Sequence, residues 1–174
     1  MRPFILSVAL ACALAISACA SDAGRPRLAP VGLTLALAAS SDVNPDDKGR
    51  AAPIVVRLYE LKDAATFNDA DFFTLQDKDK TVLADDLLVR DQFQLRPGES
   101  MTITREANQA TTTLGVLAAY RDLPNAVWRA TWRLPSRPEA AWYRRSPRLG
   151  LTIRLDRAAI VIADEQSKAQ AADR

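Results

Sequence analysis

The stretch Val31-Gly-Leu-Thr-Leu-Ala-Leu-Ala38 decides the fold class, because leucine or valine alternates in it with small or polar residues. Alternation with a period of two is typical of a β-strand that is buried on one face. The next apolar stretch, Ile54-Val-Val-Arg-Leu-Tyr-Glu-Leu61, is rich in β-branched residues and apolar on both faces, which indicates an interior strand. The folded part of the chain therefore begins as a β-protein.

The same period continues along the chain. Six further strands are expected, over residues 87–95, 101–104, 114–120, 126–134, 149–155 and 160–162. The Pro97-Gly98 turn is expected to join the third and fourth strands as a hairpin. About eight short strands separated by turns predict an all-β domain, a two-sheet β-sandwich over residues 31–163.

One or two short helices interrupt the strands. The first is expected to be capped by Thr66 or Asn68, with Asp69 and Asp71 in its first turn. Its buried side would be supplied by Phe72, Phe73 and Leu75. A second helix is expected over residues 138–144, and a flexible tail over 164–174.

Composition excludes several kinds of chemistry. The chain has 174 residues, which favours one domain, and it has no histidine. Triads that need an imidazole, and imidazole metal ligands, are therefore excluded. Both cysteines, Cys12 and Cys19, precede residue 20, so the body of the chain has no disulfide or zinc framework. Neither a cofactor, a metal nor enzymatic activity is expected.

The N-terminus has the pattern of an export signal. The apolar run from Phe4 to Ile16 follows a single basic residue and is too short to span a membrane. The sequence Ile16-Ser-Ala-Cys19 is similar to a bacterial lipobox, which predicts a cleaved signal peptide at residues 1–18 and a lipidated Cys19. Residues 19–30 then form the lipidated cysteine and its linker. The alternative is an ordinary cleaved signal in which the cysteine has no role.

Carboxylates give weak candidates for a site. Asp85 and Asp86 are adjacent, so on a strand they would point to opposite faces, and a turn or the start of a strand is the simpler interpretation. The segment Asp42–Asp46 begins like a calcium loop, but Asp47 and Pro53 stand where such a loop has Gly and Glu. The alternating Asp and Lys of residues 77–80 favour a solvated turn.

Aromatic and arginine residues alternate late in the chain, at Trp128, Arg129, Trp132, Arg133, Trp142, Tyr143, Arg144 and Arg145. Such a surface can bind nucleic acid, but export makes that partner improbable. On a strand, the tryptophan face would lie in the core and the arginine face would be solvated or stacked. A carbohydrate-binding platform is the alternative, and it would suit a periplasmic lipoprotein that binds peptidoglycan.

Charge is unevenly distributed. Residues 42–91 contain 12 acidic and 7 basic residues, whereas residues 121–157 contain 9 Arg and 3 acidic residues. If these segments lie at different ends, the domain is dipolar.

The loop between the first two strands is the most unusual segment. Residues 39–53 are long for a hairpin connection, and long ordered loops often carry function. Their Asp, Asn, Pro and Gly residues favour fixed local turns. A floppy insertion is the alternative.

Several segments, taken in order, resemble the TssJ family (VasD, Lip, SciN), the outer-membrane lipoproteins of type VI secretion. They are Asp42–Asp46, Pro53–Leu61, Ala70–Phe73, Asp85–Leu88, Leu95–Ser100, Leu114–Asp122 and Trp128-Arg129, together with the lipobox. The resemblance covers nearly the whole domain from residue 31, and only the stretch 136–147 departs from it.

The resemblance implies a transthyretin-like β-sandwich without enzymatic activity. It implies a lipid anchor at the periplasmic face of the outer membrane, and docking of the periplasmic C-terminal part of TssM in a membrane complex that also contains TssL. It places the partner-binding loop at Ser40, Ser41, Asp42, Val43, Asn44, Pro45, Asp46, Asp47, Lys48, Gly49 and Arg50.

Overall fold

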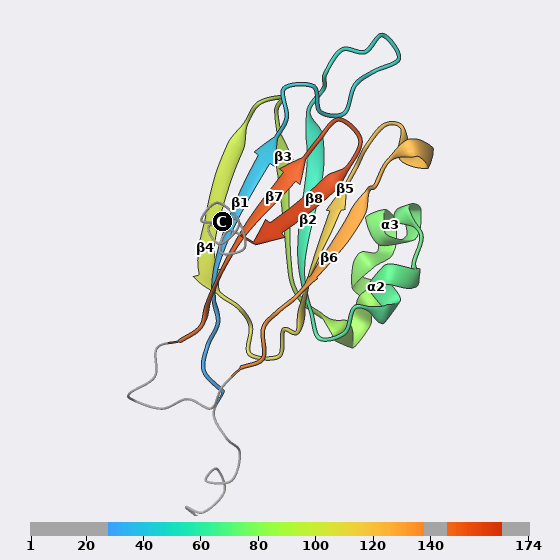
Figure 1. Cartoon of the computed structure of the whole chain (residues 1–174). Coiled ribbons are helices and arrows are strands. Elements are labelled where there is room, and N and C mark those ends of the chain that lie inside the picture. The colour runs from blue at the N-terminus through green and yellow to red at the C-terminus, as the bar shows by residue number, and fades with distance from the viewer. Residues whose placement is uncertain (1–27, 138–145, 165–174) are drawn as a thin grey trace, which may run out of the picture.

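A computed structural model describes residues 28–137 and 146–164 of the chain, which form two four-stranded sheets facing each other (Figure 1). The strands are β1 (Gly32–Ala39), β2 (Ile54–Leu61), β3 (Leu87–Leu95), β4 (Ser100–Glu106), β5 (Thr113–Ala118), β6 (Arg129–Arg133), β7 (Arg148–Leu155) and β8 (Ile160–Asp164). Their order is β4-β1-β7-β8 in one sheet and β3-β2-β5-β6 in the other. The prediction of an all-β sandwich with eight strands is confirmed.

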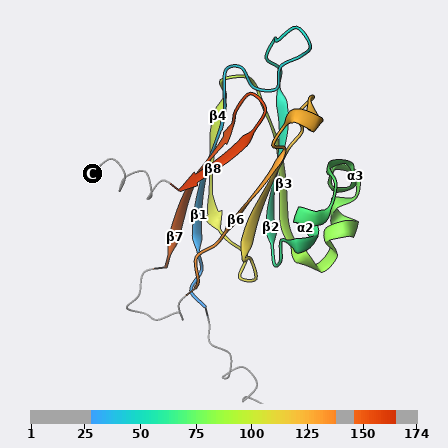
Figure 2. The same ribbon diagram turned by 45° about the vertical axis from the view of Figure 1, so that its right-hand side comes forward.

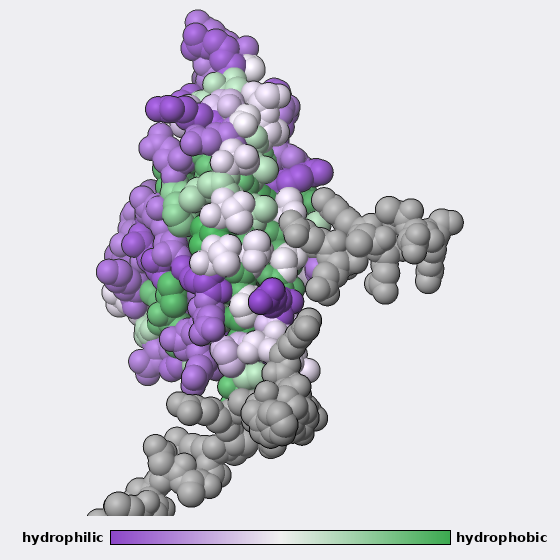
Figure 3. Space-filling view, turned by 90° about the vertical axis from the view of Figure 1, so that its left-hand side faces the viewer, coloured by the Kyte–Doolittle hydropathy of each residue, from purple (hydrophilic) through white to green (hydrophobic). Residues whose placement is uncertain are grey.

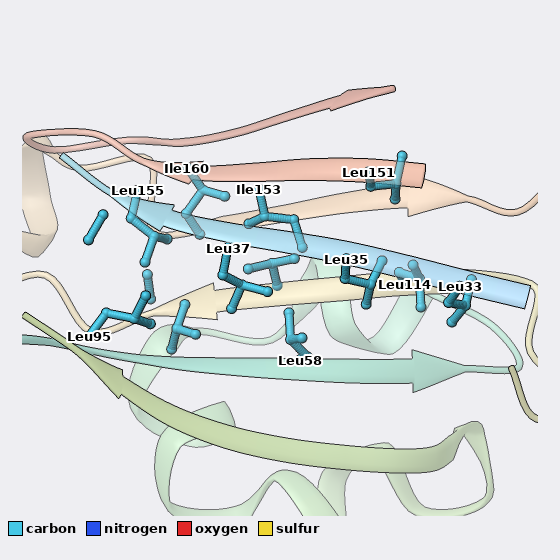
Figure 4. Packing of buried hydrophobic residues seen from close by; sticks show 14 of the residues in the cluster. Leu33, Leu35, Leu37, Leu58, Leu95, Leu114, Leu151, Ile153, Leu155 and Ile160 are labelled. Carbon is cyan, nitrogen blue, oxygen red and sulfur yellow. The ribbon is translucent and has the colours of Figure 1, made fainter. Parts of the chain in front are cut away.

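The core lies between the sheets and follows from the alternation in β1. Leu33, Leu35 and Leu37 are buried, and β7 runs parallel to β1 with Leu149, Leu151 and Ile153 in register beside them. Side chains from β2, β3, β5 and β8 close the layer from the opposite side and the edge (Figure 4). The β2 strand has β3 and β5 as neighbours, so its interior position is also confirmed.

The predicted hairpin of the third and fourth strands is wrong. β3 pairs with β2, whereas β4 pairs with β1 in the opposite sheet. The turn between them crosses from sheet to sheet, and Gly98, with φ +78°, donates its N–H to the carbonyl oxygen of Ser40. The alternation of the sequence defines which side chains face inward but does not define which strand is the neighbour.

Two helices cover the outer face of the β3-β2-β5-β6 sheet, α2 (Ala65–Asp69) and α3 (Phe72–Leu83) (Figures 1 and 2). The predicted cap is wrong, because the extended backbone of Ala70 ends α2 and Asp71 caps α3 by accepting the Thr74 N–H at 3.0 Å. Phe72 and Leu75 are buried as predicted, but Phe73 is 64% exposed. Two 3-10 turns, η2 (Ala84–Asp86) and η3 (Leu123–Asn125), complete the elements.

Residues 77–80 do not form a solvated turn. They belong to α3, and Asp79 is buried against the sheet. Its position is explained by helical spacing, since Phe72, Leu75, Asp79 and Leu83 are the buried residues of this helix.

The predicted signal peptide, Cys19, the 138–144 helix and the tail beyond residue 164 lie outside the described residues. Within residues 28–137 and 146–164, no helix is both long and apolar enough to cross a membrane.

Candidate functional site

The loop of residues 40–53 projects from one end of the sandwich (Figures 1 and 2). We call this the loop end, because β1 finishes here at Ala39, and we call the opposite end, where β1 starts at Gly32, the base. The described chain starts near the base at Leu28. β1 and β2 lie in opposite sheets, so this loop is a crossover between sheets and not a long hairpin turn.

The root of the loop is fixed to the sandwich. Ser40 donates its N–H to the carbonyl oxygen of Leu155 at the end of β7, and it accepts the N–H groups of Val43 and Gly98. Ala52 donates its N–H to the carbonyl oxygen of Val43, which brings the two arms of the loop together. The Val43 side chain is fully buried in the core.

Asn44 joins the loop to two other segments. Its side-chain Nδ2 donates to the carbonyl oxygen of Pro53 at 2.9 Å, and its Oδ1 accepts the N–H of Arg121 at 2.8 Å. Its own N–H donates to the carbonyl oxygen of Arg157. The residue is 4% exposed and has φ +50°, a conformation that asparagine tolerates better than most residues. Asn44 therefore positions the loop and is not itself available to a partner.

The projecting turn is organised by Asp46. Its carboxylate accepts the N–H groups of Lys48 and Arg50, both at 2.9 Å, and the Arg50 Nε at 2.8 Å. These bonds, led by the one from the Arg50 side chain, lower the pKa of Asp46, so the carboxylate stays ionised. Gly49 has φ +74° and donates its N–H to the Asp46 carbonyl oxygen. The whole network argues against a floppy insertion.

Exposed polar groups remain at the tip. Asp47, Lys48, Gly49 and Arg50 are exposed, as are Ser41 and Asp42 nearer the root. The space-filling view shows hydrophilic residues gathered at this end of the molecule (Figure 3). Beside the tip lies an open hollow of about 360 Å³, which is lined by Asn44, Pro45, Asp46, Asp47, Tyr120, Arg121, Asp122, Arg157 and Ala158.

Parts of the acidic and basic segments meet at the loop end, so the condition for a dipole, that the two segments lie at different ends, is not met there. Arg121 and Arg157 line the same hollow as Asp46 and Asp47. Arg157 also lies 3.9 Å from Asp42, with both side chains more than half exposed, which makes this pair weak. The sequence pointed only to the loop, because nothing local shows that residues near 121 and 157 fold beside it.

The other sequence candidates do not assemble a site. Asp85 and Asp86 lie in η2 at the start of β3, as expected for a turn. The side-chain oxygens of Asn44 and Asp46 accept hydrogen bonds within the protein, from the Arg121 N–H and from Arg50, so they are not free calcium ligands. Among the described residues, no three Asp, Glu, Cys or His side chains are grouped as metal ligands.

The tryptophans of β6 and of the residue before it are partly buried. Trp132 packs against the cluster between the sheets, and Trp128 packs both against that cluster and against the one beneath α2 and α3. The Arg129 guanidinium lies 4.8 Å from the centre of the Trp128 ring. This agrees with the expectation of a buried tryptophan face and stacked arginine, and it leaves little room for a sugar on Trp128. Trp142, Tyr143, Arg144 and Arg145 lie outside the described residues.

Comparison with known proteins gives a consistent result. The family model described as "Type VI secretion lipoprotein, VasD, EvfM, TssJ" matches residues 32–158. The crystal structure of the T6SS lipoprotein TssJ1 from Pseudomonas aeruginosa is 39% identical, covers 78% of this chain and 97% of its own, and has a TM-score of 0.71. Lip from Serratia marcescens is 31% identical, with 77% and 98% covered and a TM-score of 0.69.

A third structure shows the same fold at lower identity. It is described as the T6SS protein TssM C-terminal domain from EAEC, and the matched chain is 22% identical, with 76% of this chain and 97% of that chain covered and a TM-score of 0.58. Among curated protein sequences, the comparison found no match.

Proposed function

The chain belongs to the type VI secretion lipoprotein family, and on that premise we propose that it is a lipid-anchored outer-membrane subunit whose 40–53 loop docks the periplasmic C-terminal part of TssM. The observation that carries this proposal is the position of a rigid, polar loop at the end of the sandwich opposite the base.

Geometry makes an anchor at Cys19 compatible with docking at the loop. Leu28 lies nine positions after Cys19, and this segment reaches at most about 30 Å when extended. β1 then carries the chain over eight residues, or about 26 Å, from the base to the loop end. An acyl group on Cys19 would therefore hold the base towards the membrane and leave the loop pointing into the periplasm.

The internal bonds of the loop favour tight docking. Binding costs free energy when flexible segments have to become ordered. Here Asn44 fixes the root and Asp46 fixes the turn before any partner arrives, so that cost is reduced. The exposed charges of Asp47 and Lys48 are then free to set the orientation and specificity of the complex.

The relatives support the same assignment. Lip of Serratia marcescens is described as a membrane-bound component of the type VI secretion system. The structure of the TssM C-terminal domain contains a chain with the fold described above. Membership in the type VI secretion lipoprotein family makes TssM the first partner to test.

The test reverses the charges at the tip. We propose a double variant, Asp47→Lys with Lys48→Glu, because neither side chain takes part in the bonds that shape the loop. The matched control is Lys62→Glu with Glu106→Lys, which exchanges an exposed acid and base near the base of the sandwich. The tip variant should bind the TssM C-terminal domain about tenfold or more weakly, and the control should bind like wild type. Wild-type affinity of the tip variant would refute the loop assignment.

A further inference from the structure

Phe73 is an exposed aromatic side chain on a rigid support. Four large apolar side chains of the described residues are exposed, and Phe73, at 64%, is the most exposed of them. It lies in the first turn of α3, immediately after the buried Phe72. Its exposure raises the question of whether this part of the helix is loosely attached.

The aromatic contacts show that it is not. The Phe73 and Phe72 rings meet edge to face with their centres 5.5 Å apart, and Phe72 meets Trp128 in the same way at 5.4 Å. Next to Trp128, Arg129 donates from Nη1 to the carbonyl oxygens of Phe67 at 3.2 Å and Ala70 at 2.7 Å. The start of α3 is therefore tied to β6.

A buried ionic cluster fastens the rest of the helix. The Asp79 carboxylate lies 2.6 Å from Arg90 Nε and 3.3 Å from Arg57 Nη1, and it accepts the Tyr59 hydroxyl at 3.0 Å. Burial raises the pKa of Tyr59, so this hydroxyl stays protonated and can donate. Arg57 also donates to the carbonyl oxygens of two α3 residues, Leu75 and Gln76.

Carboxylates surround Phe73 without basic partners. Asp69 and Asp71 precede it and Asp77 follows it by one helical turn, and all three are exposed. Bonds from Thr74 lower the pKa of Asp71, so that group is ionised at neutral pH. Within the described parts of the chain, no Lys or Arg forms an ion pair with any of the three. Within four residues of Phe73 along the chain there are thus three carboxylates and no basic side chain.

The residues that support Phe73 lie next to the loop end. Val127, the residue before Trp128, is 56% exposed and donates its N–H to the carbonyl oxygen of Ala158 at 2.9 Å. Ala158 lines the hollow beside Pro45 and Asp46. The segment from Tyr120 to Trp128 thus connects the candidate docking loop with the residues that support Phe73.

We infer that Phe73 is a second anchor for the protein partner that docks at the loop. The partner would present an apolar recess bordered by basic side chains, which would bury the ring and face the surrounding carboxylates. Exposed aromatic residues that are already held rigid are the usual anchors of interfaces, because their burial costs little ordering entropy. This inference rests on the proposed function, since it assigns an additional contact to the same complex.

The test compares an exposed apolar residue of α3 with an exposed apolar residue of β8, which belongs to the sheet that α3 does not cover. Full-length protein carrying Cys19→Ser, which removes the acylation site, is titrated with the TssM C-terminal domain with and without Phe73→Ala. The substitution should leave the unfolding midpoint unchanged and weaken binding about 10- to 100-fold. Val161→Ala, at a 39% exposed position of β8, should bind like the parent.

The contribution of the carboxylates near Phe73 is measured separately, through the association rate. Asp69→Asn with Asp77→Asn should slow association several-fold at low salt and flatten its salt dependence. Unchanged affinity of Phe73→Ala, while the Asp47→Lys/Lys48→Glu variant loses binding, would overturn the second anchor and leave the loop assignment intact. Failure of the parent protein to bind the TssM domain at all would overturn both.

Discussion

The most informative single substitution is Asn44→Ala, because Asn44 determines how the loop is held. The variant loses the Nδ2 bond to the Pro53 carbonyl oxygen and the Oδ1 bond from the Arg121 N–H. A buried polar group left without a partner costs about 1–3 kcal/mol. Alanine at φ +50° costs about 1 kcal/mol more. These contributions do not add fully, so we expect a loss of about 2–4 kcal/mol in the free energy of unfolding.

A second substitution separates the loss of the side-chain hydrogen bonds from the backbone strain at positive φ. Asn44→Gly removes the same side-chain bonds, but glycine adopts a positive φ without strain. It should therefore be more stable than Asn44→Ala by about 1 kcal/mol and still less stable than wild type. Urea denaturation at pH 7 gives the free energy of unfolding of wild type, Asn44→Ala and Asn44→Gly. A free energy of unfolding for Asn44→Ala within about 0.5 kcal/mol of wild type is the range expected for an unimportant surface position. That result would show that the Asn44 side-chain bonds do not hold the loop.

Three further predictions concern the anchor, the helix support and the loop turn. Cys19→Ser should move the protein from the membrane to the soluble fraction, and continued membrane fractionation would contradict the lipid anchor. Asp79→Ala should destabilise the fold by up to about 3 kcal/mol, because it removes the buried carboxylate that pairs with the partly buried Arg57 and Arg90; a midpoint of unfolding equal to that of wild type would show that the cluster is dispensable. The folded-state pKa of Asp46 lies below its ordinary value of 3.8, so its contribution to stability is present above that pH and is lost as the pH falls through the folded pKa. The stability difference between wild type and Asp46→Asn should accordingly shrink in denaturation series from pH 7 to pH 3, and a constant difference would exclude the ionised carboxylate as its source.

Local pattern was sufficient to predict the strands but not their neighbours. The leucines of β1 face inward because residues two apart share a face, and that rule needs no knowledge of the rest of the chain. The pairing of β1 with β4 and β7 depends on contacts between segments more than 60 residues apart. A good turn sequence such as Pro97-Gly98 does not establish that the strands on either side of it pair, and here they belong to opposite sheets.

The sequence contained a signal that Asp79 is buried on a helix. Asp79 lies seven residues after Phe72 and four after Leu75, which is the spacing of a buried helical face. The neighbouring lysines made this segment look solvated, and only the structure shows the arginines of β2 and β3 that neutralise the carboxylate. The cap at Asp71 was harder to choose, since Thr66, Asn68 and Asp69 are also good capping residues.

In the candidate docking loop, the sequence indicates the segment but does not distinguish the roles of its residues. The sequence predicts the same partner-binding role for Asn44, Pro45 and Asp46. In the structure, Asn44 is buried and holds the root of the loop, whereas Asp46 organises the projecting turn. The charged residues that remain free at the tip are Asp47 and Lys48. Side-chain burial, which decides between these roles, depends on the distant segments near residues 121 and 157.

The affinity of the TssM C-terminal domain for the loop-tip variant tests the central claim most directly. Isothermal titration of that domain into full-length Cys19→Ser protein, with and without Asp47→Lys/Lys48→Glu, gives both dissociation constants under one condition. We predict binding by the parent protein and a loss of about tenfold or more in the tip variant, with no change in its unfolding midpoint. Equal dissociation constants for the two proteins would contradict docking through the loop.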